Sequence, residues 1–166
     1  MASLATIARG SLNLPDPDGH LVRNASRYPT YEVETLVAYA TLGLDLTRVC
    51  INVKNSWRYP CGGTAYDGVP EISNAPRETE YLITIRLGPA RMFPVSLPHK
   101  RRSPQREIGC WREAVVAMAA HEAKHIEQYR LGLPRSEVEC ECFEAAILDR
   151  YRAEIGVNRI GARVAG

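Results

Sequence analysis

Several features that define particular classes of protein are missing from this sequence. No apolar run is long enough to cross a membrane, and no charged segment precedes an apolar stretch in the manner of a secretory signal peptide. The formal net charge is only +2, so the composition does not indicate a partner of opposite charge. We therefore expect a cytoplasmic protein that does not enter a membrane.

Cysteine is scarce and lacks the spacing of a metal site. The five cysteines include no C-x-x-C pair, so a structural zinc site built from thiolates is not expected. An odd number of cysteines without a signal peptide favours reduced thiols. The cysteines are therefore expected to be neither metal ligands nor disulfide partners.

The length and composition predict one folded domain. The chain has 166 residues, of which 45% are hydrophobic and 24% charged, as is typical of a globular protein. We expect residues 1–166 to form a single domain. Residues 1–29 contain the turn cluster Pro15-Asp-Pro-Asp-Gly19 and are expected to be an arm or loop over the core.

The segment between residues 30 and 108 predicts one helix and three strands. Residues 30–42 place apolar side chains on one helical face. Residues 48–54 alternate in the manner of a strand, residues 62–68 form a short candidate strand between glycines, and residues 80–87 are rich in β-branched and aromatic residues. Residues 90–108 contain three prolines and are expected to be a loop.

The most informative stretch is His121-Glu-Ala-Lys-His125, which reads H-E-x-x-H. Residues 111–131 around it contain no glycine or proline and predict a helix that ends near Gly132. Residues four apart lie on the same helical face, so two imidazoles at this spacing can bind one zinc ion. Glu122 lies beside them, where it can take a proton from a zinc-bound water.

A second helix is expected over residues 136–151, after the loop 132–135. Ser136 can cap this helix, and Glu139 completes a capping box. A catalytic zinc needs a third protein ligand, and three glutamates lie on one stripe of the helix: Glu137, Glu141 and Glu144. Simple hairpin symmetry favours the later two, although the loop is long enough to bring the first within reach of the histidines as well.

Together the two helices resemble the gluzincin metallopeptidases. In that family H-E-x-x-H is followed on the next helix by E-x-x-x-D, whose Glu is the third zinc ligand and whose Asp holds a ligand histidine. Glu137-x-x-x-Glu141 is similar to that motif with Glu in place of Asp, and the resemblance covers roughly residues 78–151. It implies that His121, His125 and Glu137 bind zinc. It also implies that Glu141 accepts a hydrogen bond from a zinc-bound histidine.

The resemblance further implies a minimal zincin fold of the α+β class, with a small, mostly antiparallel sheet, an N-terminal helix, the histidine helix and the glutamate helix. One zinc per chain would activate water for hydrolysis of a peptide or protein substrate, with Glu122 as general base. The strand nearest the histidine helix would be an edge strand that binds extended substrate, and the cleft would lie between that helix and the last strand. The candidates for stabilising the oxyanion are Tyr129, Arg150 and Tyr151.

Two other functions are compatible with the sequence. One is a catalytically silent zinc-binding module, and the other is a nucleic-acid-associated protein that uses the basic loop 99–106. A chance pair of histidines is disfavoured, because the preceding run of Ala and Val should be buried and buried histidines without partners are destabilising. The sequence thus predicts a zinc metallopeptidase and leaves these alternatives open.

Overall fold

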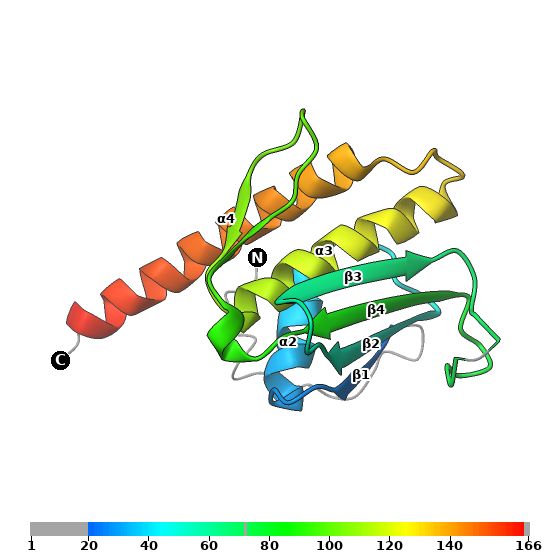
Figure 1. Cartoon of the computed structure of the whole chain (residues 1–166), viewed down its shortest axis with the longest axis horizontal. Coiled ribbons are helices and arrows are strands. Elements are labelled where there is room, and N and C mark those ends of the chain that lie inside the picture. Colours follow the sequence, from blue (N-terminus) through cyan, green and yellow to red (C-terminus); the bar gives the residue numbers. More distant parts are fainter. Residues whose placement is uncertain (1–19, 72, 165–166) are drawn as a thin grey trace.

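The computed structural model describes residues 20–71 and 73–164. Figure 1 shows an α+β architecture in which the long helix α3 lies across a four-stranded sheet, with α4 beside α3 on the side away from the sheet. The strands of this sheet are β1 (Leu21–Ala25), β2 (Val49–Asn55), β3 (Cys61–Tyr66) and β4 (Tyr81–Leu87). The α-helices are α2 (Thr30–Ala40), α3 (Trp111–Arg130) and α4 (Glu137–Val164).

The four-stranded sheet is mixed, and its strand order is β1-β2-β4-β3. β1 and β4 both run parallel to β2, and only β3 is antiparallel to its neighbour β4. The prediction of a mostly antiparallel sheet is therefore wrong. The reading of residues 1–29 as an arm or loop is also wrong for residues 21–25, which form β1; residues 1–19 lie outside the described part. Helix α2 supplies the crossover that two parallel strands require.

The sheet has one apolar face, which packs against the helices. Ile51 and Val53 of β2 and Ile83 and Ile85 of β4 are fully buried, and they belong to one core with the Ala114–Ala120 run of α3. Alternate residues of the same strands lie on the other face, as the pleat of a strand requires. Burial of the alanine and valine run fixes α3 against the sheet and so places His121 and His125, which follow it.

Residues 90–108 contain more regular structure than the expected loop. A short 3₁₀ turn, η1 (Ala90–Met92), is followed by β5 (Val95–Leu97) and β6 (Arg106–Ile108), which pair in an antiparallel hairpin. The prediction failed because strands of three residues are too short to show periodicity among prolines. The hairpin rises beside α4 (Figure 1), where Lys100 N and Ser103 Oγ donate hydrogen bonds to the Glu141 carboxylate.

Helix α4 returns antiparallel to α3, as predicted. Gln128, near the end of α3, contacts Glu139, whereas His121, two turns earlier, contacts Glu144. Ser136 caps α4 by accepting a hydrogen bond from Glu139 N at 3.3 Å. The reciprocal half of the predicted capping box is not formed, because the Glu139 carboxylate accepts from Gln128 instead. None of the described helices is both long and apolar enough to cross a membrane.

Candidate metal centre

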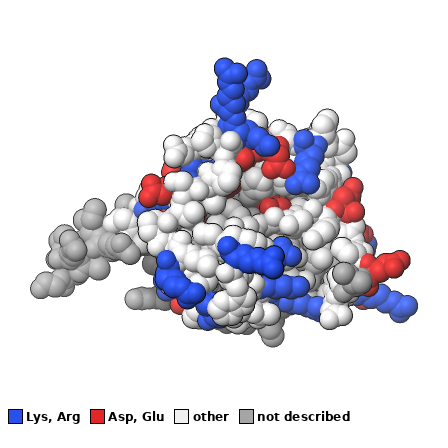
Figure 2. Space-filling model, viewed as in Figure 1, with Lys and Arg blue, Asp and Glu red and all other residues white. Residues whose placement is uncertain are grey.

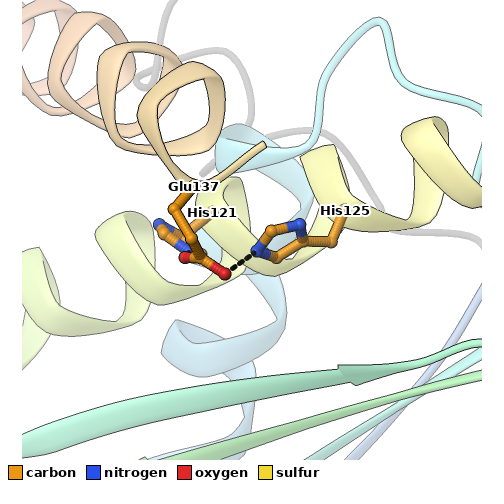
Figure 3. A group of neighbouring side chains, drawn as sticks. All are labelled: His121, His125 and Glu137. Atoms are coloured by element: carbon orange, nitrogen blue, oxygen red, sulfur yellow. Dashed lines mark ion pairs between the residues drawn. The ribbon is translucent and has the colours of Figure 1, made fainter. Parts of the chain in front are cut away.

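The two histidines of α3 and the first residue of α4 converge on one point. The rings of His121 and His125 are one helical turn apart, with centroids separated by 5.0 Å. His121 Nε2 lies 3.3 Å from Glu137 Oε2, and His125 Nε2 lies 3.4 Å from Glu137 Oε1. Figure 3 shows the Glu137 carboxylate facing both rings from the neighbouring helix. One ligand atom from each residue lies within 4.8 Å of the others, so the three side chains can hold one metal ion.

Buried polar atoms near this point lack a hydrogen-bond partner among the described residues. His125 is fully buried and its Nε2 is unpartnered, and Glu122, which is 4% exposed, has an unpartnered Oε2. A buried polar atom without a partner is destabilising, and such atoms are uncommon in folded proteins. The donor set of two imidazoles and a carboxylate suits zinc. The residues present therefore fit a bound metal ion, which would bond to His125 Nε2 where the structure has only a 3.4 Å contact with Glu137.

The charges of the site favour metal-binding forms of two of the ligands. Burial lowers the pKa of His125, so this ring is held neutral with a free lone pair. Burial alone would raise the pKa of Glu137, but its contacts with the two histidines and with Arg135 lower it, which favours the ionised carboxylate. The pKa of His121 is raised, because a hydrogen bond with Glu144 and nearby carboxylates outweigh its burial.

Glu144, rather than Glu141, orients the first histidine. Its carboxylate is fully buried, and Oε2 lies 3.0 Å from His121 Nδ1. Nδ1–H therefore donates to Glu144 and directs Nε2 toward Glu137. Arg106, whose side chain is only 4% exposed, forms an ion pair with Glu144 and holds this carboxylate in place.

The predicted role of Glu141 is therefore corrected. Glu141 accepts hydrogen bonds from the hairpin, and its Oε1 lies 3.4 Å from Arg106 Nη2. The helical repeat explains the difference. Residues seven apart are displaced by only about 20° around a helix and residues four apart by about 40° in the other direction. Glu144 thus shares the face of Glu137, whereas Glu141 is turned toward the hairpin.

The second histidine is held by one residue of α3 and one residue of α4. His125 Nδ1 lies 3.1 Å from Gln128 Oε1 and 3.3 Å from Cys140 Sγ, and both partners are buried. Gln128 is in turn fixed by Ser136 N and by the Glu139 carboxylate. Sequence reasoning missed Gln128, although its position three residues after His125 was a usable signal.

Glu122 lies against the edge strand β3. A Cβ atom added at Gly63 would lie 2.5 Å from Glu122 Oε1, so the carboxylate occupies the space that a side chain would need. The backbone of Ala65 also lowers the pKa of Glu122. Burial raises the pKa of Glu122 to about 7, against the charges of His121 and Arg135. Sequence reasoning missed the role of Gly63, although a glycine inside a strand is a signal for close approach.

The structure separates the three residues considered for oxyanion stabilisation. Tyr129 stacks on His125 with ring centroids 6.3 Å apart, and its hydroxyl lies 3.5 Å from Ala65 O of β3. Arg150 and Tyr151 instead contact Tyr39 of α2. Only Tyr129 of the three is therefore beside the histidines.

A cation that the sequence analysis did not single out also lies at the site. Arg135, in the loop between α3 and α4, has its Nε 3.0 Å from Glu137 Oε1. Its side chain is 53% exposed, so it can also contact a bound molecule. Nothing in the spacing of the motif predicts this position, which depends on how the loop folds.

The basic loop 99–106 does not act as one cationic surface. Arg106 is buried and paired with Glu141 and Glu144, so it is unavailable to a nucleic acid. The tip of the hairpin is exposed, and Figure 2 shows cationic side chains projecting from it at the top of the view. A nucleic-acid-associated protein that uses this loop would therefore have to bind without Arg106.

Comparisons of the chain with protein-family models, curated proteins and solved structures gave no match. The functional argument therefore depends on the geometry of the site and on the chemistry of its residues.

Proposed function

We propose that this chain is a zinc-dependent metallopeptidase of the gluzincin type. The observation that carries the proposal is the convergence of His121, His125 and Glu137 from two helices, with the buried Glu122 beside them. Three protein ligands leave one position for water or substrate, which is the arrangement of catalytic rather than structural zinc sites. Buried partners on the far side of both imidazoles support the same reading, since metal-binding histidines are usually oriented in this way.

Glu122 is the general base in this proposal. Zinc, when bound, supplies a Lewis acid that makes a water molecule acidic near neutral pH. Glu122 takes the proton of the attacking water and later gives a proton to the leaving amine. The close approach of β3 at Gly63 holds the carboxylate in position for both transfers. Of the three candidates from the sequence, we propose Tyr129 as the residue that stabilises the oxyanion, because its ring stacks on His125.

We further propose that β3 binds the substrate in extended form. Among the described strands, β3 pairs only with β4, so its other edge carries backbone groups that can pair with a peptide. The sequence analysis predicted a cleft between the histidine helix and the last strand of the sheet, which is β4. Because β4 lies in the interior of the sheet, we propose that the cleft lies beside the edge strand β3 instead. Because Glu122 lies against β3, a peptide added to that edge would place its backbone near the general base.

The test of the proposed function combines metal analysis with a hydrolysis assay. We expect one zinc per purified chain and cleavage of casein or a peptide library. Activity should disappear with a chelator and return when zinc is added back, because the ligands are the chain's own residues. One zinc without hydrolysis would favour the silent zinc-binding module. A chain that binds no zinc would overturn the proposal.

Gly63→Ala is expected to reduce hydrolysis by about 10²-fold or more, because the added methyl group displaces the Glu122 carboxylate. Zinc content should not change, since Glu122 is not a ligand. The matched control is Gly62→Ala, whose Cβ would meet only the Tyr59 ring, at 3.3 Å. Rates and zinc content of both variants test this. Normal hydrolysis by Gly63→Ala would show that Glu122 does not need its present position.

A further inference from the structure

The face of the sheet away from α2 and α3 has a hollow of about 550 Å³. It is lined by residues of all four strands and by Pro70, Ser73 and Asn74 in the segment between β3 and β4. Leu82 and Thr84 of β4 line the hollow and are each only 4% exposed. The hollow therefore lies on the opposite face of the sheet from the core and from the helix that carries the histidines.

The hollow is rich in hydrogen-bond donors of positive charge. Arg23, Lys54 and Arg86 come from three different strands, and the described lining residues include no Asp or Glu. Figure 2 shows Lys and Arg side chains gathered over the lower part of the molecule, where β2 and β4 lie in Figure 1. Arginine and lysine side chains donate hydrogen bonds and accept none. An anion with several acceptor oxygens would therefore be complementary to this lining in charge and in hydrogen bonding.

The register of the sheet brings two of these cations together. Lys54 and Arg86 are direct partners in the parallel pairing of β2 with β4. Like charges side by side on neighbouring strands are destabilising. Within residues 20–71 and 73–164 neither side chain forms an ion pair with a carboxylate. An anion bound between them would relieve this repulsion.

Amide groups complete the lining. Asn52 faces Arg23 across the β1–β2 pairing and Thr84 across the β2–β4 pairing. Its Oδ1 accepts from Cys50 Sγ at 3.7 Å, so its amide nitrogen remains a donor for a ligand. Arg23 also donates to Asn74 O, which holds that part of the wall against β1.

We propose that this hollow binds a small molecule that carries phosphate groups. A phosphate group presents several charged oxygens to separate donors, which matches two guanidinium groups and an ammonium group better than a single carboxylate does. The volume is within the range of small-molecule sites, about 300–1,000 Å³. The inference does not rest on the peptidase proposal, because it uses none of the residues around His121.

The test is calorimetric titration of the full-length protein with inorganic pyrophosphate. We expect binding by the unaltered chain and a loss of affinity of about tenfold or more in Lys54→Gln and in Arg86→Gln, because each removes charged hydrogen bonds. The matched controls are Lys100→Gln and Arg101→Gln in the exposed hairpin tip, which change the net charge equally. These controls should bind pyrophosphate as the unaltered chain does.

Three results would overturn the inference. The first is that the unaltered chain does not bind pyrophosphate, and the second is that the hairpin controls lose as much affinity for pyrophosphate as Lys54→Gln and Arg86→Gln do. The third is that a short single-stranded oligonucleotide binds more tightly than pyrophosphate through Lys54 and Arg86. The last result would assign the hollow to nucleic acid. Measuring zinc content in every variant separates this test from the metal centre, since loss of phosphate binding with zinc retained affects only the sheet face.

Discussion

Replacing Glu122 with Gln is expected to abolish peptide hydrolysis while one zinc ion stays bound. Glutamine keeps the size of the side chain but cannot take a proton from the attacking water, so the rate should fall by about 10²-fold or more. The three ligands, His121, His125 and Glu137, are untouched by the change. Zinc content and kcat/KM of the purified variant measure the two effects separately.

The matched control for this variant is Glu127→Gln on the same helix. Glu127 forms a surface ion pair with Lys124 and contacts none of the three ligands in the described structure. Its replacement removes the same charge, and we expect hydrolysis to be unchanged. Full activity of Glu122→Gln would remove Glu122 from the mechanism, whereas loss of zinc from it would make Glu122 a ligand.

Replacing Glu137 with Ala is expected to abolish tight zinc binding, and with it hydrolysis. Glu137 supplies the only carboxylate that lies between the two Nε2 atoms in the described residues. Two histidines one turn apart remain, but they leave zinc without its third protein ligand. Zinc titration against a competing chelator measures the loss. Tight binding by Glu137→Ala would contradict the ligand assignment.

The same titration distinguishes the other two glutamates of α4. Glu144→Gln should weaken zinc binding by about 10–100-fold, because Glu144 orients the His121 ring. Glu141→Gln should have a smaller effect, since Glu141 contacts the hairpin and Arg106. Glu144→Asp, which keeps the charge, should recover part of the affinity that Glu144→Gln loses. A larger effect at Glu141 than at Glu144 would restore the role of Glu141 that the resemblance implied.

These variants also separate the enzyme from a silent zinc-binding module. A silent module would lose zinc in Glu137→Ala. It would show no hydrolysis in the unaltered chain, so Glu122→Gln and Gly63→Ala would change nothing that the assay measures. An enzyme would lose hydrolysis in all three and keep zinc in the last two. The metal centre and the catalytic base are therefore tested by different measurements.

The sequence by itself predicted the helices around the site. The helix of residues 111–131 and the antiparallel return of the next helix agree with α3 and α4, although α4 continues to Val164, beyond the predicted end at residue 151. Ser136 also caps α4 as expected. These features are local: helical spacing, a run without glycine or proline, and a capping residue act over a few positions. The same spacing put His121 and His125 on one face, and the structure brings them together with Glu137.

Tertiary structure decided how the strands pair. Residues 21–25 carry no periodic pattern that distinguishes them from a loop, and they become β1 only through pairing with β2. The parallel direction of β2 and β4 is likewise a consequence of which strand lies beside which. Such contacts join segments far apart in the chain, so no local pattern contains them.

Tertiary structure also decided which side chains support the metal centre. Glu141 and Glu144 lie on one stripe of α4, and the packing of that helix between α3 and the β5–β6 hairpin turns Glu144 toward His121 and Glu141 toward the hairpin. The need for glycine at Gly63 depends on how closely β3 approaches Glu122. The helical repeat selects the residues that can share a face, whereas packing between elements determines which of them meet, because it sets the rotation and distance of one element against another.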